Sequence, residues 1–357
     1  MRVEEMVLNG ERNVTLTAYI QEVAGEFRNI EKRPAILILP GGGYQFCSDR
    51  EADPVAMPFL KAGFQVFILR YSVKEDAVWP NPLDDYEQAM ELIRSKEEEW
   101  KLYADKVAVI GFSAGGHLAG CAAAMSKNRP NAAVLGYAVL GEDVKGCNVS
   151  APDVIASVDA DTCPCFVFAT RTDNVVPIEN STRFLTALAD AGIAFESHIY
   201  SYGPHGFSTC DSSVQALDGI TKRAPGWVND SIGWLKEILG DFGENGLEAP
   251  KCPARVNDDN MPYLSVDCSF KRLQQVPAAK QILDGIFQNM RSSAAEQYAD
   301  NPMMDLMSEN TEGGGLFSIV RNMTLRDILS FGRVTDDIVA AINSQLEKIP
   351  NVSKASN

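Results

Sequence analysis

The sequence predicts an α/β fold with a mostly parallel central sheet and helices on both of its faces, followed by a mainly helical C-terminal domain. Two observations support this. Along about the first 240 residues, short apolar runs typical of buried strands alternate with segments whose apolar residues recur every three or four positions, as in helices. The remaining residues show mainly the helical spacing. We therefore expect two domains, residues 1–247 and 248–357.

The composition narrows the classes of function. The chain has 357 residues, 45% of them hydrophobic, which is enough for a sizeable core. Its net charge is −16, of which −14 falls in residues 1–250, and such an acidic first domain repels phosphate backbones. No apolar run is long enough to cross a membrane, and the N-terminus lacks the pattern of a signal peptide. We expect a cytoplasmic protein with a weakly charged substrate, and neither nucleic acid nor membrane as a partner.

The elements can be justified in chain order. Residues 14–20 alternate between apolar and polar, as in a strand with one exposed face, whereas residues 35–39 form the continuous apolar run of a strand buried on both faces. A helix is expected over residues 51–62, because its apolar residues share one face and Gly63 ends it. Further strands are expected at residues 64–69, 107–110, 132–140, 165–170 and 195–200, and further helices from about Asn81 and over residues 178–191.

The C-terminal part begins after a change in composition. Residues 240–246 are rich in glycine and acidic side chains, which predicts a linker or surface loop. Beyond them Pro277 can open one helix, and Thr335 with two following aspartates can cap another. Six methionines here are expected to fill an irregular core, and the glycines at 313–315 to form a flexible connection. This domain could make the protein a homo-oligomer, cap the site or buttress the core.

A candidate nucleophile lies where an apolar run gives way to a helix. The segment GFSAG, residues 111–115, follows the β-branched run at residues 107–110. A serine on such a tight strand-to-helix turn, a nucleophile elbow, requires residues without side chains two positions before and after it. Gly111 and Gly115 meet that requirement, so Ser113 is the predicted nucleophile.

A serine nucleophile needs a base, and the chain contains three histidines. His117 falls on the helix four residues after Ser113 and is expected to point into packing. His198 falls inside the strand at residues 195–200, which commits its side chain to one sheet face. Only His205 lies on a loop beyond a strand end, in GPHGF, so it is the predicted base.

The remaining parts of a serine hydrolase site can also be found. Asp173 directly follows a buried strand and is the predicted acid that orients the base. The glycine loop, residues 40–44 with the sequence PGGGY, can aim backbone amides at a reacting carbonyl oxygen. We expect Gly42, Gly43 and the amide of Ala114 to form the oxyanion hole.

Metal and redox chemistry are not expected. The eight cysteines are scattered without paired ligand spacing, apart from Cys163 and Cys165 on either side of a proline. Two ligands one residue apart, in a chain with three histidines, make a poor zinc site. The sequence predicts free thiols, no metal and no cofactor.

At these residues the chain resembles the α/β-hydrolase superfamily and, within it, the carbohydrate esterases that include acetylxylan esterases and related carboxylesterases. The resemblance covers about residues 15–240 and includes the order Ser113, Asp173, His205. It implies hydrolysis of short acyl esters, often acetyl groups on plant polysaccharides or their oligosaccharides, through an acyl-enzyme and without a metal. The matching segments are residues 39–44, Glu51 with Val55 and Ala56, residues 69–71, 111–117, 164–177, and His198 through Gly206.

The expected function is therefore a serine carboxylesterase acting on short-chain esters of saccharides such as acetylated xylo-oligosaccharides. Bulky side chains beside the site should limit the acyl group to about two to four carbons, since each buried methylene would otherwise add up to about 0.8 kcal/mol. Of these, Tyr44, Trp79 and Phe207 are expected to contact substrate, with Phe46 nearby. A serine peptidase or amidase, a feruloyl-type esterase and a catalytically idle binding module remain alternatives.

Overall fold

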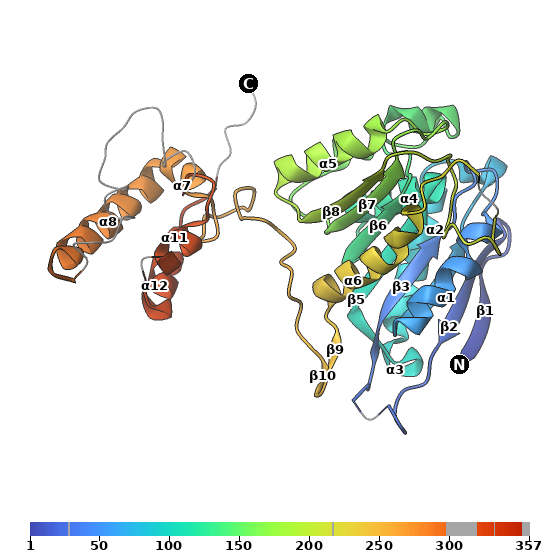
Figure 1. Ribbon diagram of the computed structural model, residues 1–357, viewed down its shortest axis with the longest axis horizontal. Coiled ribbons are helices and arrows are strands. Elements are labelled where there is room, and N and C mark those ends of the chain that lie inside the picture. Colours follow the sequence, from blue (N-terminus) through green and yellow to red (C-terminus); the bar gives the residue numbers. More distant parts are fainter. Residues whose placement is uncertain (28, 216–217, 298–319, 332, 352–357) are drawn as a thin grey trace. The chain divides into compact units, whose positions relative to one another are not determined.

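The computed structural model describes residues 1–27, 29–215, 218–297, 320–331 and 333–351. The chain divides into two compact units, Met1–Ala254 and Arg255–Asn357 (Figure 1). The boundary lies a few residues beyond the one expected near residue 247. The expectations for residues 313–315 and for Met303, Met304 and Met307 fall outside the described residues.

The first unit is built on an eight-stranded sheet, which confirms the predicted α/β class. Its strand order is β1-β2-β4-β3-β5-β6-β7-β8. From β4 to β8 neighbouring strands run parallel, whereas β2 is antiparallel to both β4 and β1. The strands are β1 (Arg2–Asn9), β2 (Val14–Ile20), β3 (Arg33–Leu39), β4 (Gln65–Arg70), β5 (Leu102–Phe112), β6 (Ala132–Gly136), β7 (Cys165–Thr170) and β8 (Phe195–Tyr200).

Helices cover both faces of this sheet (Figure 1). One face packs against α2, α4 and α5, and the other against α1 and α6. Alternate residues of β3 show this division, because Leu37 and Leu39 belong to the first core and Ile36 and Ile38 to the second. The helices are α1 (Asp53–Lys61), α2 (Asn81–Ser95), α3 (Glu97–Trp100), α4 (Ser113–Met125), α5 (Glu179–Ala191) and α6 (Trp227–Leu239).

Three segments differ from expectation. Strand β1 was not anticipated, because it is an edge strand with no fully buried residue and no apolar run. The strand expected over residues 132–140 ends at Gly136. The Tyr137 amide still donates to the carbonyl oxygen of Phe168 at 2.7 Å, but its positive φ of 36° stops the strand from continuing. The glycine-rich stretch forms a two-stranded ribbon, β9 (Phe242–Gly243) with β10 (Gly246–Leu247), inside the first unit.

The second unit is helical in the residues described, as predicted. It comprises α7 (Phe270–Gln275), α8 (Pro277–Gln297), α11 (Leu325–Phe331) and α12 (Asp336–Leu346). Pro277 opens α8 and Thr335 precedes α12, although the Thr335 hydroxyl makes no capping bond. Its own core includes Leu264, Leu273, Leu283, Leu325 and Leu346. Across the described part of the chain, we find no helix whose length and hydropathy would let it cross a membrane.

Candidate active site

Ser113 lies on a strained turn between β5 and α4. Its φ of 52° falls in the left-handed region, which a residue with a side chain adopts only where the surroundings enforce it. The surroundings are tight, because a Cβ on Gly115 would lie 2.2 Å from the carbonyl oxygen of Leu39 and 2.4 Å from that of Pro40. The predicted elbow geometry is therefore present, and the Ser113 side chain is held at the carboxyl edge of the parallel strands.

The structure brings Ser113, His205 and Asp173 together from three loops that follow β5, β8 and β7. His205 Nε2 lies 2.9 Å from Ser113 Oγ, and His205 Nδ1 lies 2.7 Å from Asp173 Oδ2. An ionised carboxylate only accepts hydrogen bonds, so the proton belongs on Nδ1. Nε2 is then free to accept the proton of the serine hydroxyl.

Asp173 is itself fixed in place. Its second oxygen, Oδ1, accepts hydrogen bonds from the amides of Val175 and Val176, each at 2.9 Å. Its side chain is 1% exposed and that of His205 14%. A carboxylate held by its own loop keeps the imidazole in one tautomer and one orientation.

His117 is a packing residue, as the sequence predicts. It is buried in α4, where Nδ1 lies 2.7 Å from the Tyr44 hydroxyl and Nε2 lies 2.8 Å from the carbonyl oxygen of Pro152. The carbonyl can only accept, so Nε2 donates to it and Nδ1 accepts from the tyrosine. Burial lowers the pKa of His117 to about 4, so the ring is neutral near pH 7.

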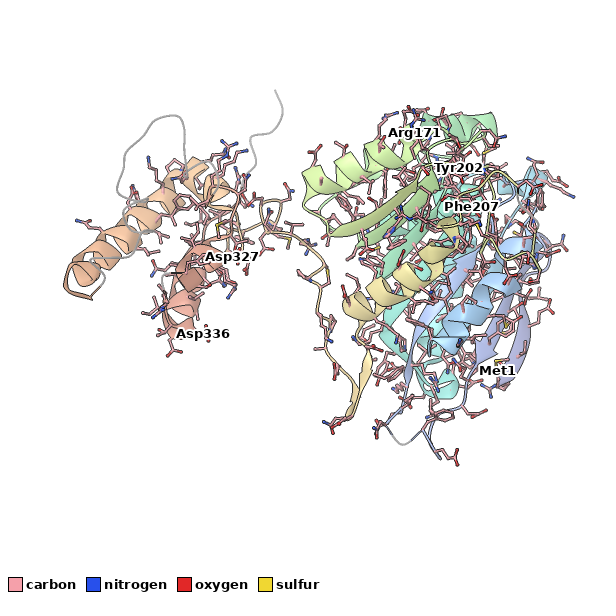
Figure 2. All side chains as sticks on the ribbon, viewed as in Figure 1. Met1, Arg171, Tyr202, Phe207, Asp327 and Asp336 are labelled. Atoms are coloured by element: carbon pink, nitrogen blue, oxygen red, sulfur yellow. The ribbon has the colours of Figure 1, made fainter. Side chains whose placement is uncertain are left out.

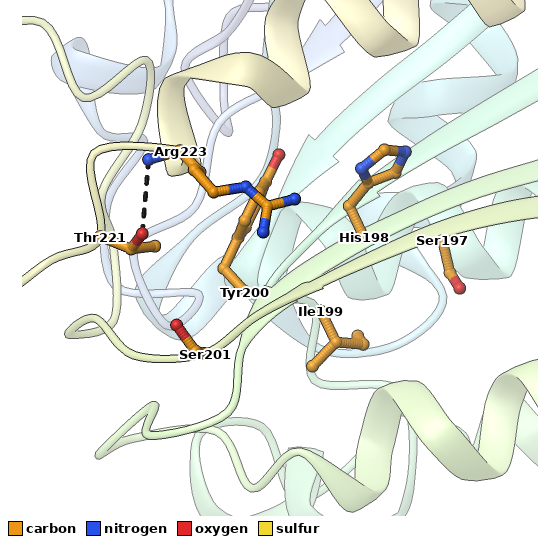
Figure 3. Close-up of a pocket in the computed structure, with 7 residues that line it drawn as sticks. All are labelled: Ser197, His198, Ile199, Tyr200, Ser201, Thr221 and Arg223. Carbon is orange, nitrogen blue, oxygen red and sulfur yellow. Dashed lines mark hydrogen bonds between the residues drawn. The ribbon is translucent and has the colours of Figure 1, made fainter.

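His198 lies on β8 and faces a separate pocket. Its Nε2 is 2.8 Å from Glu196 Oε1. The pocket has a volume of about 330 Å³, and Tyr200 and Arg223 are among its lining residues (Figure 3). Neither His117 nor His198 bonds to Ser113, so His205 alone of the three histidines does so.

The glycine loop places free amides beside the serine. Within the described chain, the amides of Gly42, Gly43 and Ala114 donate to no protein acceptor, whereas the carbonyl of Gly42 accepts from Gln45 at 3.0 Å. Gly42 and Gly43 have positive φ values of 135° and 61°. The loop therefore has donors available for an oxyanion.

Two expected substrate contacts need correction. Tyr44 and Phe207 have no exposed surface. Tyr44 is buried against His117, and the Phe207 ring packs 4.7 Å from that of Tyr137, so both support the site from beneath. Trp79 is half-buried, with its ring 5.8 Å from His117.

Exposed aromatic side chains near the site come from other positions. Phe46, just after the glycine loop, is 57% exposed, and Tyr202, three residues before His205, is 48% exposed. Figure 2 shows Arg171, Tyr202 and Phe207 near one end of the first unit and Met1 near the other.

Sequence reasoning also assigned no role to Glu51 and Tyr137. Glu51 Oε2 accepts from the Gly41 amide at 2.7 Å, and Glu51 Oε1 accepts from the Tyr137 hydroxyl at 2.6 Å. Glu51 follows Asp49 and Arg50, which are exposed, so nothing in the local pattern marks it as buried. Tyr137 lies just beyond the end of β6, inside the strand that was expected over residues 132–140.

Comparison with known proteins identifies the family. The BD-FAE family model matches residues 26–135. Over 211 residues the chain is 30% identical to endo-1,4-β-xylanase B of Butyrivibrio fibrisolvens, covering 50% of this chain and 33% of the relative. Over 227 residues it is 29% identical to an acetylxylan esterase of Xylanibacter ruminicola, covering 56% of this chain and 47% of the relative. The chain thus spans a third to about half of the length of these curated relatives.

Among solved structures, the chain matches MGS-M1, an α/β-hydrolase enzyme from a Medee basin deep-sea metagenome library. The two are 44% identical with a TM-score of 0.64, and the match covers 67% of this chain and 98% of that one. Both the strand order and the turn at Ser113 agree with this similarity. The chain belongs to the α/β-hydrolase family.

Proposed function

We propose that the protein is a serine carboxylesterase that hydrolyses short acyl esters of saccharides. The observation that carries the proposal is the continuous chain of hydrogen bonds from Asp173 through His205 to Ser113, at the carboxyl edge of the sheet. The acetylxylan esterase among the sequence relatives supports the ester class and the acetyl group.

The geometry supports a mechanism through an acyl-enzyme. Ser113 Oγ attacks the ester carbonyl carbon while His205 Nε2 takes its proton, and Asp173 stabilises the imidazolium that forms. The amides of Ala114 and of Gly42 or Gly43 donate to the oxyanion. His205 then protonates the leaving alcohol, and water activated by His205 releases the acyl group from Ser113.

The surroundings of the site suit a saccharide alcohol. Phe46 follows the glycine loop by two residues and Tyr202 precedes His205 by three, and both expose flat aromatic surface that can stack on the apolar face of a sugar. Tyr44 and Phe207 fill the space beneath the site, which favours a small acyl group over a long one. The exposed ring of Phe46 would equally accept a feruloyl group, so a feruloyl-type esterase remains the second candidate.

A set of ester substrates tests this proposal. Nitrophenyl esters from acetyl to decanoyl should show the highest kcat/KM at about two to four carbons. Acetate release from acetylated xylo-oligosaccharides should exceed ferulate release from feruloylated ones, and a fluorophosphonate should label Ser113. Efficiency that rises steadily to decanoate, preferred cleavage of the matching anilides, or a label on another serine would contradict the proposal.

A further inference from the structure

Glu51 is a buried carboxylate placed directly beneath the proposed active site. It ends the short 3-10 helix η1 (Asp49–Glu51) and is 4% exposed. Both partners that donate to its oxygens, the Gly41 amide and the Tyr137 hydroxyl, are neutral. A buried charge with only neutral partners is costly to a fold, so its presence calls for another explanation.

The first link from Glu51 leads to the glycine loop. Gly41 immediately precedes Gly42 and Gly43, the proposed oxyanion donors. A Cβ on Gly41 would lie 2.8 Å from Glu51 Oε2 and 3.0 Å from the Cβ of Ser113. The carboxylate and the serine therefore lie against the same side of Gly41, and the bond to the Gly41 amide sets the path of the loop.

The second link leads to the loop that carries His205. The Tyr137 hydroxyl donates to Glu51 and accepts a hydrogen bond from the amide of Ser208 at 3.0 Å. The Tyr137 ring also lies edge-on to the His205 ring, with centroids 5.1 Å apart. Through this one tyrosine, Glu51 holds both the backbone after His205 and the position of the imidazole.

The charge of Glu51 acts on the same histidine. Burial raises the pKa of Glu51, whereas the hydrogen bonds from Tyr137 and Gly41 lower it. Positive charge on His205 and on the neighbouring Arg50 also lowers it, so Glu51 and His205 interact electrostatically. In the proposed reaction His205 gains a positive charge when it takes the serine proton. The carboxylate therefore stabilises the imidazolium formed during the reaction more than it stabilises the resting site.

We propose that Glu51 is a positioning residue for ester hydrolysis: its ionised carboxylate ties the glycine loop to the His205 loop and favours the imidazolium state of His205. This inference rests on the proposed function. It adds a residue that touches neither substrate nor the reacting atoms and acts through Gly41, Tyr137 and His205.

The test compares Glu51→Gln with Glu87→Gln. Glu87 is also a buried carboxylate that accepts from one backbone amide and one hydroxyl, those of Lys127 and Ser126, and it additionally pairs with the Lys127 ammonium. Glu87→Gln therefore makes the same chemical change away from Ser113. Steady-state hydrolysis of 4-nitrophenyl acetate is followed across pH, together with thermal unfolding of the full chain. Tyr137→Phe serves as a second variant, because it cuts one link and keeps Glu51.

We expect Glu51→Gln to lower kcat about tenfold to a hundredfold, as displaced catalytic groups do, with KM changed less than about threefold. Its acidic limb should move to lower pH, because the imidazolium loses a nearby negative charge. Its melting temperature should stay near or above the wild-type value, because a costly buried charge is gone. Tyr137→Phe should lower kcat by a smaller factor, whereas Glu87→Gln should keep wild-type kcat and pH profile.

The outcomes separate the two proposals. If the wild-type protein neither hydrolyses the ester nor accepts a fluorophosphonate on Ser113, the proposed function fails, and this inference fails with it. If the wild type is active but folded Glu51→Gln keeps its kcat and pH profile, only the inference about Glu51 is overturned. Should Glu51→Gln not fold, a folded Tyr137→Phe with wild-type kcat overturns it.

Discussion

A buried glutamate lies near each end of helix α4, and the pKa values of the two glutamates shift in opposite directions. At the Ser113 end, Glu51 accepts from one backbone amide and one hydroxyl, and at the far end Glu87 does the same with Lys127 and Ser126. Glu87 has one additional partner, because the ammonium of Lys127 lies 2.9 Å from its Oε2. Glu87 thus has a cation among its direct partners, whereas both hydrogen-bond donors to Glu51 are neutral.

The pKa directions express this difference. Burial raises the pKa of Glu51. Burial acts to raise the pKa of Glu87 too, but the hydrogen bonds from Lys127 and Ser126 together outweigh it and lower that pKa. A carboxyl group whose pKa falls on folding stabilises the fold near neutral pH, and one whose pKa rises does the reverse. Ionised Glu87 therefore stabilises the fold at the far end of α4, whereas ionised Glu51 destabilises it at the Ser113 end, where we propose that it acts in catalysis.

The largest expected effect comes from removing the nucleophile. Ser113→Ala should lower kcat for 4-nitrophenyl acetate by at least about 10⁴-fold, because the proposed mechanism forms its covalent intermediate on this hydroxyl. The melting temperature should hardly fall, since the side chain leaves a strained turn and loses little packing. Turnover near the wild-type rate, or a fluorophosphonate adduct that persists by mass spectrometry, would place the nucleophile elsewhere.

The next largest effect is expected from replacing His205, and it distinguishes this histidine from His198. His205→Ala should lower kcat at least about a thousandfold, because it removes the only histidine that bonds to Ser113. His198→Ala is the matched control on the same chain segment and should keep kcat within about threefold. An inactive His198→Ala beside an active His205→Ala would mean that the base has been misassigned.

The tight packing at the Ser113 end can be tested with two glycines. Gly115→Ala should destabilise the protein by roughly 3 kcal/mol or more, because the new methyl group meets backbone oxygens that cannot move aside. Gly233→Ala, in α6, meets nothing within 4 Å and should stabilise by up to about 1 kcal/mol. Denaturant unfolding measures both changes. A neutral Gly115→Ala would show that the turn is looser than the structure indicates.

The smallest expected effect is at the far end. Glu87→Gln should lower the free energy of unfolding by about 1–3 kcal/mol at pH 7, because a charged acceptor is replaced and Lys127 loses its partner. The lowered pKa means that this stabilisation is present above the unfolded pKa of about 4.3 and is lost as pH falls below it. Urea unfolding at pH 7 and pH 3.5 should therefore show a smaller difference at the lower pH. If wild type and Glu87→Gln differed more at pH 3.5 than at pH 7, the ionised Glu87 carboxylate would not be stabilising the fold.

The sequence was informative where one residue type is required by geometry. Gly111 and Gly115 on either side of a serine point to the elbow, because no other residue fits the turn. The meeting of Ser113, Asp173 and His205 was predictable because the carboxyl ends of parallel strands share one edge of the sheet. Their catalytic roles stay predictions until the variants are measured.

Burial was less predictable, because it depends on contacts between distant segments. Tyr44 and Phe207 look like substrate contacts when only their distance along the chain from the motifs is considered, yet both are covered. Glu51 matches the family resemblance, but no local pattern predicts its burial, and one of its two partners is Tyr137, 86 positions away. Strand β1 was missed because an exposed edge strand needs no apolar run.

Helix α4 also has a consequence for attempts to redirect the proposed esterase to other substrates. Every residue from Ala114 to Ala124 is buried, and eight of the thirteen residues of the helix are alanine or glycine, so each added side chain would displace a neighbouring element. Mutagenesis libraries directed at this helix would mostly yield misfolded protein. Diversity is better introduced at Phe46, Val175 and Tyr202, which are exposed at loops close to Ser113, Asp173 and His205 and can change without disturbing the core.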